Sequence, residues 1–256
     1  MKVRRILAAL TCLVLVLSCF AACGEKKPSE KEAAKTAKNE TTAAATQAPS
    51  GPVEASWFDD AVFVGDSVTL KLSYYCENHP DALSDTQFFC AGSLGYTNAL
   101  WDINAEGNVH PYYQGTNYLS QDCAKVTGAK KVFIMLGMND IGLYGIEDSM
   151  KSAKTLIGNI LKTTPDVKIY VQSVTPIIAG KERGDLNNAN IKLFNAELVK
   201  YCKEKGYTYL DVNTIMADES GYLKSEYCSD PDAQGIHFTD AACSMWADFL
   251  KNNVLK

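Results

Sequence analysis

Histidine is scarce in this sequence, and its cysteines lack the spacing of a metal site. The three histidines, His79, His110 and His237, are scattered and have no paired acidic residues. Zinc sites usually take ligands from cysteine or histidine pairs roughly two to four residues apart. No C-x-x-C pair occurs among the last six cysteines: Cys76, Cys90, Cys123, Cys202, Cys228 and Cys243. We therefore expect neither a metal ion nor a cofactor.

Residues 25–52 lack every aromatic residue and every Ile, Leu, Val and Met. Lys, Glu, Ala, Thr, Ser and Pro make up most of this segment. Such a composition cannot bury enough apolar surface to offset the entropy lost on ordering, so we predict a disordered tether. A flexible chain of about 28 residues has a root-mean-square reach on the order of 30 Å.

The first 22 residues have the pattern of a secretory signal peptide. Three cations within the first five residues precede the uncharged, largely apolar residues 6–22. A membrane-spanning helix is the alternative, but about 17 residues is at the low edge for crossing a bilayer. The end of the segment, Phe20-Ala21-Ala22-Cys23-Gly24, resembles a bacterial lipobox, in which the cysteine is lipidated. We expect export with Cys23 as a lipid anchor to the outer face of the cell membrane, or else ordinary cleavage and secretion.

No basic run occurs beyond the signal segment. The net charge of −5 becomes −8 once the three cations of the signal are removed. This balance argues against nucleic acid as a partner and against an anionic polymer bound by charge alone. Three regions are expected: a signal peptide over 1–22, a lipidated cysteine and linker over 23–52, and one domain over 53–256, which is long enough for a buried α/β core. In an exported protein the six cysteines of the domain could form disulfides, and their pairing stays open, as does the oligomeric state.

Short apolar runs alternate with helical patterns along the domain. Strands are predicted at 61–65, 88–91, 131–136, 167–174 and 207–212, and helices at 68–78, 146–162, 186–205 and 239–252. This alternation predicts a parallel sheet covered on both faces by helices. The expected fold is a three-layer α/β/α sandwich of flavodoxin-like type, with a central five-stranded parallel sheet. Ligands of such folds bind beyond the carboxyl ends of the strands.

Four short blocks lie beside these predicted elements. Their sequences are Gly65-Asp66-Ser67, Gly92-Ser93-Leu94-Gly95-Tyr96-Thr97, Gly137-Met138-Asn139-Asp140 and Gly235-Ile236-His237. The first three follow predicted strands, and the fourth precedes the last predicted helix. In order and context they resemble the four blocks of the SGNH (GDSL) hydrolases, over residues 61–250. The resemblance implies an SGNH fold and a serine ester hydrolase that forms an acyl-serine intermediate.

One residue of each block carries an implied role. Ser67 corresponds to the nucleophile, and His237 to the general base that takes its proton. The backbone N–H groups of Ser67 and Gly95 and the side-chain amide of Asn139 correspond to the oxyanion hole, where fixed donors face the developing negative charge. Glycine at 95 is expected to let the backbone approach the substrate closely.

Each of these residues also has a plain structural interpretation. Ser67 could cap a helix, Asn139 could belong to an ordinary loop, and His237 could be a surface histidine. Their joint occurrence favours the functional interpretation. Asp66 and Asp140 are expected to stabilise their loops by accepting hydrogen bonds from backbone N–H groups.

One position departs from the family pattern. The carboxylate that orients the histidine usually lies three residues before it, and here that residue is Gln234. Asp232 or Asp230 could substitute from a shifted loop, and Asp232 is the residue we place in the site. Alternatively, Gln234 or a backbone carbonyl could orient His237, or the site could be a catalytically inactive binding site.

The segment from 101 to 118 is dense in aromatic and amide side chains: Trp101, Asn104, Asn108, Tyr112, Tyr113, Gln114, Asn117 and Tyr118. Such groups suit stacking on and hydrogen bonding to sugars, although they could equally pack the loop against itself. No extended apolar lid suited to long acyl chains is evident. We expect an acetyl or other short acyl ester of a carbohydrate as the substrate. A GDSL lipase or lysophospholipase and a non-catalytic saccharide-binding lipoprotein are the alternatives, and an O-acyltransferase is disfavoured.

Overall fold

The computed structural model describes residues 51–254. The predicted signal peptide, Cys23 and the predicted tether up to residue 50 lie outside these residues. No helix within 51–254 combines the length and the apolar character needed to cross a membrane.

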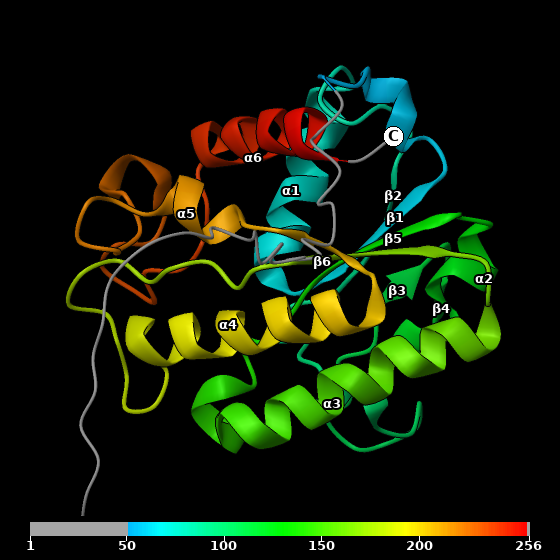
Figure 1. The fold of residues 1–256 in the computed structure, drawn as a ribbon, viewed down its shortest axis with the longest axis horizontal. Helices are drawn as coiled ribbons and strands as arrows, with labels where there is room; N and C mark the ends of the chain where they lie inside the picture. Colours follow the sequence, from blue (N-terminus) through cyan, green and yellow to red (C-terminus); the bar gives the residue numbers. More distant parts are fainter. Residues whose placement is uncertain (1–50, 255–256) are drawn as a thin grey trace, which may run out of the picture. The chain divides into compact units, whose positions relative to one another are not determined.

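A five-stranded parallel sheet forms the centre of the domain, as predicted (Figure 1). Its strands lie in the order β2-β1-β5-β6-β7. Their bounds are β1 Ala61–Gly65, β2 Gln87–Cys90, β5 Lys131–Met135, β6 Lys168–Gln172 and β7 Thr208–Leu210. A separate antiparallel pair, β3 Tyr112–Tyr113 and β4 Thr116–Asn117, lies in the connection between β2 and β5.

Helices cover both faces of the sheet, which confirms the predicted three-layer sandwich (Figure 1). The core on one face includes residues of α2 (Cys123–Thr127), α3 (Ile141–Thr163) and α4 (Asn188–Lys205). The core on the other face includes residues of α1 (Ser67–Asn78), α5 (Val212–Met216) and α6 (Asp240–Asn253). Short 3-10 helices lie at Ala55–Phe58, Asn98–Leu100, Ser120–Asp122 and Ser225–Tyr227.

The strands alternate their side chains between these two cores, as a sheet covered on both sides requires. On β1, Val62 and Val64 belong to the α2–α4 core, whereas Phe63 belongs to the α1–α6 core. Phe63, Phe133 and Tyr170 are paired across neighbouring strands, and their rings stack with centroids 4.6 and 4.4 Å apart. This stack holds β1 and β5, the strands that precede Ser67 and Asn139, in a fixed register.

Helix α3 begins earlier than the predicted helix of residues 146–162. Its first residues form a separate turn, because Gly145 has a φ of 69° and interrupts the helical conformation. This early turn starts directly after Asn139 and Asp140 and fixes where the loop after β5 ends.

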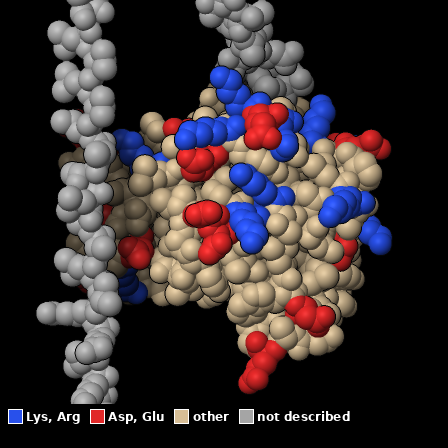
Figure 2. All heavy atoms as spheres, turned by 60° about the horizontal axis from the view of Figure 1, so that its bottom comes forward, with Lys and Arg blue, Asp and Glu red and all other residues tan. Residues whose placement is uncertain are grey.

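The surface of the α3–α4 side carries mixed charges (Figure 2). Cations and anions are interspersed over much of the face that the figure shows, and Lys200 forms an ion pair with Glu197 on α4. The cysteines of residues 51–254 are all free thiols, and five of the six are buried.

Candidate active site

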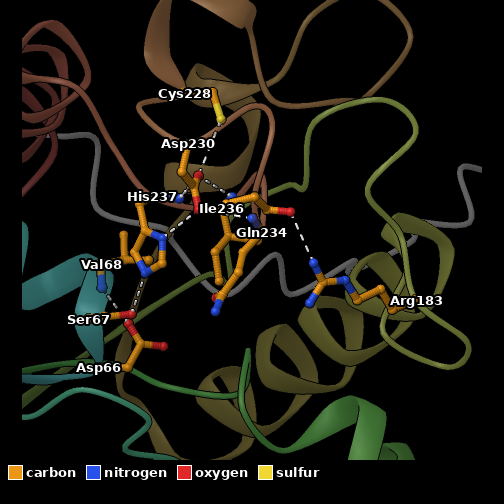
Figure 3. Close-up of polar contacts among 10 residues, drawn as sticks. Asp66, Ser67, Val68, Arg183, Cys228, Asp230, Gln234, Ile236 and His237 are labelled. Atoms are coloured by element: carbon orange, nitrogen blue, oxygen red, sulfur yellow. Dashed lines mark hydrogen bonds and ion pairs between the residues drawn. The ribbon is translucent and has the colours of Figure 1, made fainter.

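Ser67 and His237 lie in direct contact at the carboxyl edge of the sheet (Figure 3). Ser67 is the first residue of α1, two positions after β1 ends at Gly65. Thr239 caps α6 by accepting from the backbone N–H of Ala242, which places His237 just before that helix. His237 Nε2 lies 3.0 Å from Ser67 Oγ, within hydrogen-bond distance.

The turn between β1 and α1 is tight because Gly65 has no side chain. A Cβ at this position would lie 1.9 Å from Thr69 Oγ1. Asp66 caps α1, since its Oδ1 accepts from the backbone N–H of Val68 at 2.9 Å. The expected loop-stabilising role of Asp66 is confirmed, and its cap fixes the helix that begins with Ser67.

The carboxylate beside His237 belongs to Asp230. Its Oδ2 lies 2.7 Å from His237 Nδ1 (Figure 3). An ionised carboxylate only accepts hydrogen bonds, so Nδ1 carries the proton and Nε2 is left to accept from the Ser67 hydroxyl. Ser67, His237 and Asp230 therefore form a continuous hydrogen-bonded series.

Hydrogen bonds from one short loop converge on the Asp230 carboxylate. Oδ1 accepts from the backbone N–H groups of Ile236 and His237, both at 3.0 Å, and from the Cys228 thiol at 3.5 Å. Oδ2 also accepts from the backbone N–H of Gln234 at 3.2 Å. Partial burial opposes ionisation, but the hydrogen bonds from His237 outweigh it and hold the pKa of Asp230 below its usual value.

The prediction that placed Asp232 beside His237 is corrected by this geometry. Asp232 is exposed, and its backbone carbonyl accepts from Lys181 Nζ at 2.9 Å. The loop folds back because the carbonyl of Asp230 accepts from the N–H groups of Ala233 and Gly235, at 2.9 and 3.1 Å. This turn brings Asp230 to the imidazole across seven positions of sequence.

Gln234 lies three residues before His237, where the resemblance noted above implies a carboxylate, but among the described residues its side chain makes no hydrogen bond to the imidazole. Its side chain is exposed and extends from the loop toward the side of Ser67 (Figure 3). Gly235, which follows it, has a φ of 72°, and a Cβ there would lie 2.5 Å from Ile178 Cγ2. Only glycine fits this position, so the loop conformation that presents Asp230 depends on it.

Asn139 and Gly95 lie at the same edge of the sheet as Ser67. Asn139 Nδ2 donates to the carbonyl of Leu94 at 3.0 Å and contacts Asp66 Oδ2 at 3.4 Å. The backbone N–H of Gly95 donates to Asn98 Oδ1 at 2.7 Å. The blocks that contain Asn139, Gly95 and Ser67 are therefore linked by hydrogen bonds.

Asp140 holds the loop that contains Gly95. Its buried carboxyl accepts from the backbone N–H groups of Tyr96 and Thr97, both at 2.8 Å, as expected for a loop-stabilising residue. A Cβ at position 95 would lie 2.6 Å from Asp140 Oδ2. Position 95 therefore requires glycine because the carboxyl of Asp140 fills the space that a side chain would need. This reason differs from the expected one, which was close approach of the backbone to a substrate.

A cavity of about 670 Å³ opens beside Ser67 and His237. Its other lining residues come from α1 and from the segments around the start of α6: Leu70, Lys71, Tyr74, Ser229, Phe238, Thr239, Asp240 and Ala241. Lys71 and Tyr74 follow Ser67 by four and seven positions, the spacing of one helix face. Lys71 and Tyr74 were not identified from the sequence as residues of the site, although this spacing from Ser67 could have indicated them.

The aromatic segment 101–118 does not line this cavity. Tyr113 and Tyr118 pack on Phe89, with ring centroids 5.5 and 5.9 Å away, so much of the segment is held down by its own aromatics. Trp101 and Tyr112 stay exposed.

The other two histidines lie in separate environments. His79 stacks on Tyr75, and His110 is buried with its Nε2 3.4 Å from the carbonyl of Asp102. Within residues 51–254, no group of three or more His, Cys, Asp or Glu side chains could hold a metal ion.

The arrangement is suited to moving one proton from a hydroxyl to an imidazole and back. Asp230 favours the charged imidazole electrostatically and fixes its orientation, and the Ser67 oxygen becomes nucleophilic as its proton is removed. Among sequence-predicted residues, the structure brings Ser67, His237, Asn139 and Gly95 to one edge of the sheet and leaves Asp232 outside.

Comparison with known proteins agrees with this fold. The sequence model of the GDSL-like lipase/acylhydrolase family matches residues 63–243. A GDSL-like lipase from Bacteroides thetaiotaomicron superposes with a TM-score of 0.56 at 16% identity, over 79% of this chain and 89% of that one. A carbohydrate esterase family 3 protein from Talaromyces cellulolyticus gives 0.51 at 15% identity, over 75% and 94%. A search of curated protein sequences found no match.

Replacing Asp230 should separate its role from that of Asp232. We expect Asp230→Asn to lower kcat for a nitrophenyl ester by about 10⁴-fold, because an amide cannot stabilise the charged imidazole or enforce its tautomer. Asp232→Asn, the matched control, should leave kcat unchanged. A large loss in Asp232→Asn with little loss in Asp230→Asn would contradict the geometry.

Burial of Asp66 should make the stability of the domain depend on pH. Burial raises the pKa of its carboxyl from 3.8 to about 6, against the lowering effect of the hydrogen bond from Val68. Between these values the folded state binds more protons than the unfolded state, so stability falls as pH rises from about 4 to 6. Asp66→Asn keeps an N-cap acceptor and should stabilise the protein by up to about 3 kcal/mol at pH 8 but little at pH 4. Urea unfolding at both pH values measures this, and an equal effect at each would contradict it.

Proposed function

The chain belongs to the GDSL-like lipase/acylhydrolase family, and from this premise we propose that it is a serine esterase in which Ser67 is the nucleophile. The observation that carries the proposal is the hydrogen-bonded series of Ser67, His237 and Asp230, with distances of 3.0 and 2.7 Å. A hydroxyl, an imidazole and a carboxylate in this order supply a nucleophile, its base and the group that orients the base.

Acylation begins when Ser67 Oγ attacks the carbonyl carbon of the ester. As the new C–O bond forms, the hydroxyl proton passes to His237 Nε2, and the carbonyl electrons move to the oxygen. The backbone N–H groups of Ser67 and Gly95 and the amide of Asn139 are the donors proposed to stabilise this oxyanion. A fixed donor in such a site contributes about 3–4 kcal/mol to the transition state.

Collapse of the intermediate breaks the bond to the alcohol oxygen. The proton on His237 Nε2 passes to that oxygen, the alcohol leaves, and the acyl group remains on Ser67. Water then attacks the acyl-serine while His237 accepts its proton. The second tetrahedral intermediate releases the carboxylic acid, and the proton returns to Ser67 Oγ.

Asp230 supports the steps in which His237 is positively charged. Its carboxylate already accepts several hydrogen bonds in the resting site, and its pKa lies below the usual value. The carboxylate therefore stays ionised when the imidazole gains a proton. Gln234 at the usual carboxylate position favours a catalytically inactive binding site, whereas the Asp230 carboxylate 2.7 Å from His237 supports an active enzyme.

The substrate we propose is an acetyl or other short acyl ester of a carbohydrate. His237 must reach the leaving oxygen, so the alcohol part of the ester extends into the cavity that borders both His237 and Ser67. This cavity is lined by the Lys71–Asp240 ion pair and by Tyr74, a residue that is 51% exposed. A charged pair and an accessible ring suit a polar, ring-shaped alcohol better than a long hydrocarbon chain.

The expected location of the enzyme follows from residues outside the described domain. Export with lipidation at Cys23 would place the domain on the outer face of the cell membrane, within reach of the saccharides that surround a cell. Secretion after ordinary cleavage is the alternative.

Removing the Ser67 hydroxyl is the direct test of the enzyme proposal. The domain should hydrolyse nitrophenyl acetate, and Ser67→Ala should lower kcat by about 10⁵- to 10⁶-fold, because no acyl intermediate can form. Ser225→Ala changes an exposed serine away from the cavity and should behave as the wild-type protein. Hydrolysis by the wild-type protein no faster than by Ser67→Ala would refute the proposal.

Tyr74 tests the nature of the alcohol. Tyr74→Ala should raise KM for an acetylated sugar about 2- to 12-fold, the range expected for one lost ring contact, whereas Tyr74→Phe should not. Tyr112→Ala, an exposed tyrosine of the 101–118 segment, is the matched control and should leave KM unchanged. If Tyr112→Ala raises KM and Tyr74→Ala does not, the sugar binds at the 101–118 segment instead. Faster cleavage of long-chain lysolipids than of acetylated sugars would favour a lipase.

A further inference from the structure

The peptide unit between Leu94 and Gly95 is hydrogen bonded to the protein at both ends. Its carbonyl accepts from Asn139 Nδ2 at 3.0 Å, and its N–H donates to Asn98 Oδ1 at 2.7 Å. The second contact is at the short end of the range for an N–H to oxygen hydrogen bond. Gly95 N–H, which the esterase proposal needs as an oxyanion donor, therefore already has a partner.

Asn98 is held in place by its own contacts. Its Nδ2 donates to the carbonyl of Ser93 at 2.9 Å, and it is the first residue of the 3-10 helix Asn98–Leu100. The carbonyl of Gly95 accepts from the N–H of Ala99 at 3.1 Å. Asn98 Oδ1 thus accepts from the N–H three residues before it, which is the spacing of the side-chain contact in a capping box, although the N-cap of this 3-10 helix is Thr97 and not Gly95.

Stabilising this turn would by itself be a structural role for Asn98. The backbone nitrogen of Gly95, however, has only one hydrogen to donate. A backbone N–H cannot make two strong, linear hydrogen bonds at once. An oxyanion that uses the Gly95 donor must therefore replace Asn98 Oδ1 at that hydrogen.

The rest of the loop leaves few ways for this exchange to occur. Asp140 accepts from the N–H groups of Tyr96 and Thr97, which fixes the backbone on one side of Gly95. Asn139 fixes the carbonyl on the other side. Asn98 itself is only partly buried, so its side chain is the element with room to rotate away.

Building on the esterase proposal, we infer that Asn98 is a positioning residue that occupies the Gly95 donor in the resting site and competes with the substrate oxyanion for it. The oxyanion hole is completed only when the Asn98 side chain releases that N–H. Its hydrogen bond thus raises the barrier to acylation and keeps a polar donor satisfied when no substrate is bound.

Two substitutions of Asn98 should change kcat in opposite directions. Asn98→Ala removes the competing acceptor and should raise kcat for nitrophenyl acetate about 3- to 10-fold, the range for one net hydrogen bond. Asn98→Asp keeps an acceptor, so the loop stays capped, but its negative charge holds the N–H more strongly and repels the oxyanion. It should lower kcat at least about tenfold, with KM and Tm close to those of the wild-type protein.

A purely structural role predicts the reverse order. In that case Asn98→Asp would retain wild-type kcat, and Asn98→Ala would lose stability and activity together; this result would overturn the inference. If Asn98→Ala does not fold, the Asn98→Asp variant alone decides. A wild-type kcat in Asn98→Asp overturns the inference, and a lower kcat at unchanged Tm supports it. Ester hydrolysis by the wild-type protein that Ser67→Ala abolishes keeps the esterase proposal standing whichever way Asn98 behaves.

Discussion

The hydrogen bond between Asp230 and His237 is the interaction on which the site depends. It gives the imidazole one orientation and one tautomer, and so leaves Nε2 free to accept from Ser67. The same carboxylate accepts three backbone N–H groups of its own loop. The same carboxylate of Asp230 therefore stabilises the conformation of its loop and orients the imidazole of His237.

The parallel sheet supplies the second constraint. Because all five strands run in one direction, the loops after β1, β2 and β5 emerge at the same edge. Two buried carboxyls then hold these loops: Asp66 caps the helix that starts with Ser67, and Asp140 binds the backbone beside Gly95. Glycines at 65 and 95 provide the space that Thr69 and Asp140 occupy. The turns that present Ser67 and Gly95 are thus held by buried carboxyls.

The polar groups of the resting site are largely satisfied by one another. Asn139 donates to Leu94 and lies near Asp66, and Gly95 donates to Asn98. This arrangement avoids the free-energy cost of unpaired buried donors, and in the proposed mechanism the substrate exchanges some of these bonds for its own. Burial of Asp66 next to Ser67, the proposed nucleophile, also costs stability above its raised pKa. The side chains of Asp66, Asn139 and Asn98 therefore affect both the stability of the domain and the geometry of the proposed site.

The sequence by itself determined the five parallel strands, the helices on both faces, the three blocks that place Ser67, Gly95 and Asn139 after strands, and the fourth block that places His237 before the last helix. These features follow from local hydrophobic patterns and short motifs, which are properties of neighbouring residues. The choice of Asp230 over Asp232 came only from the tertiary structure, because it depends on how the chain turns at Gly235 against Ile178. The cavity beside α1 was likewise decided by packing, because α1 and the residues around the start of α6 are distant in sequence. The spacing of residues along the chain does not show which side chains the folded chain brings into contact.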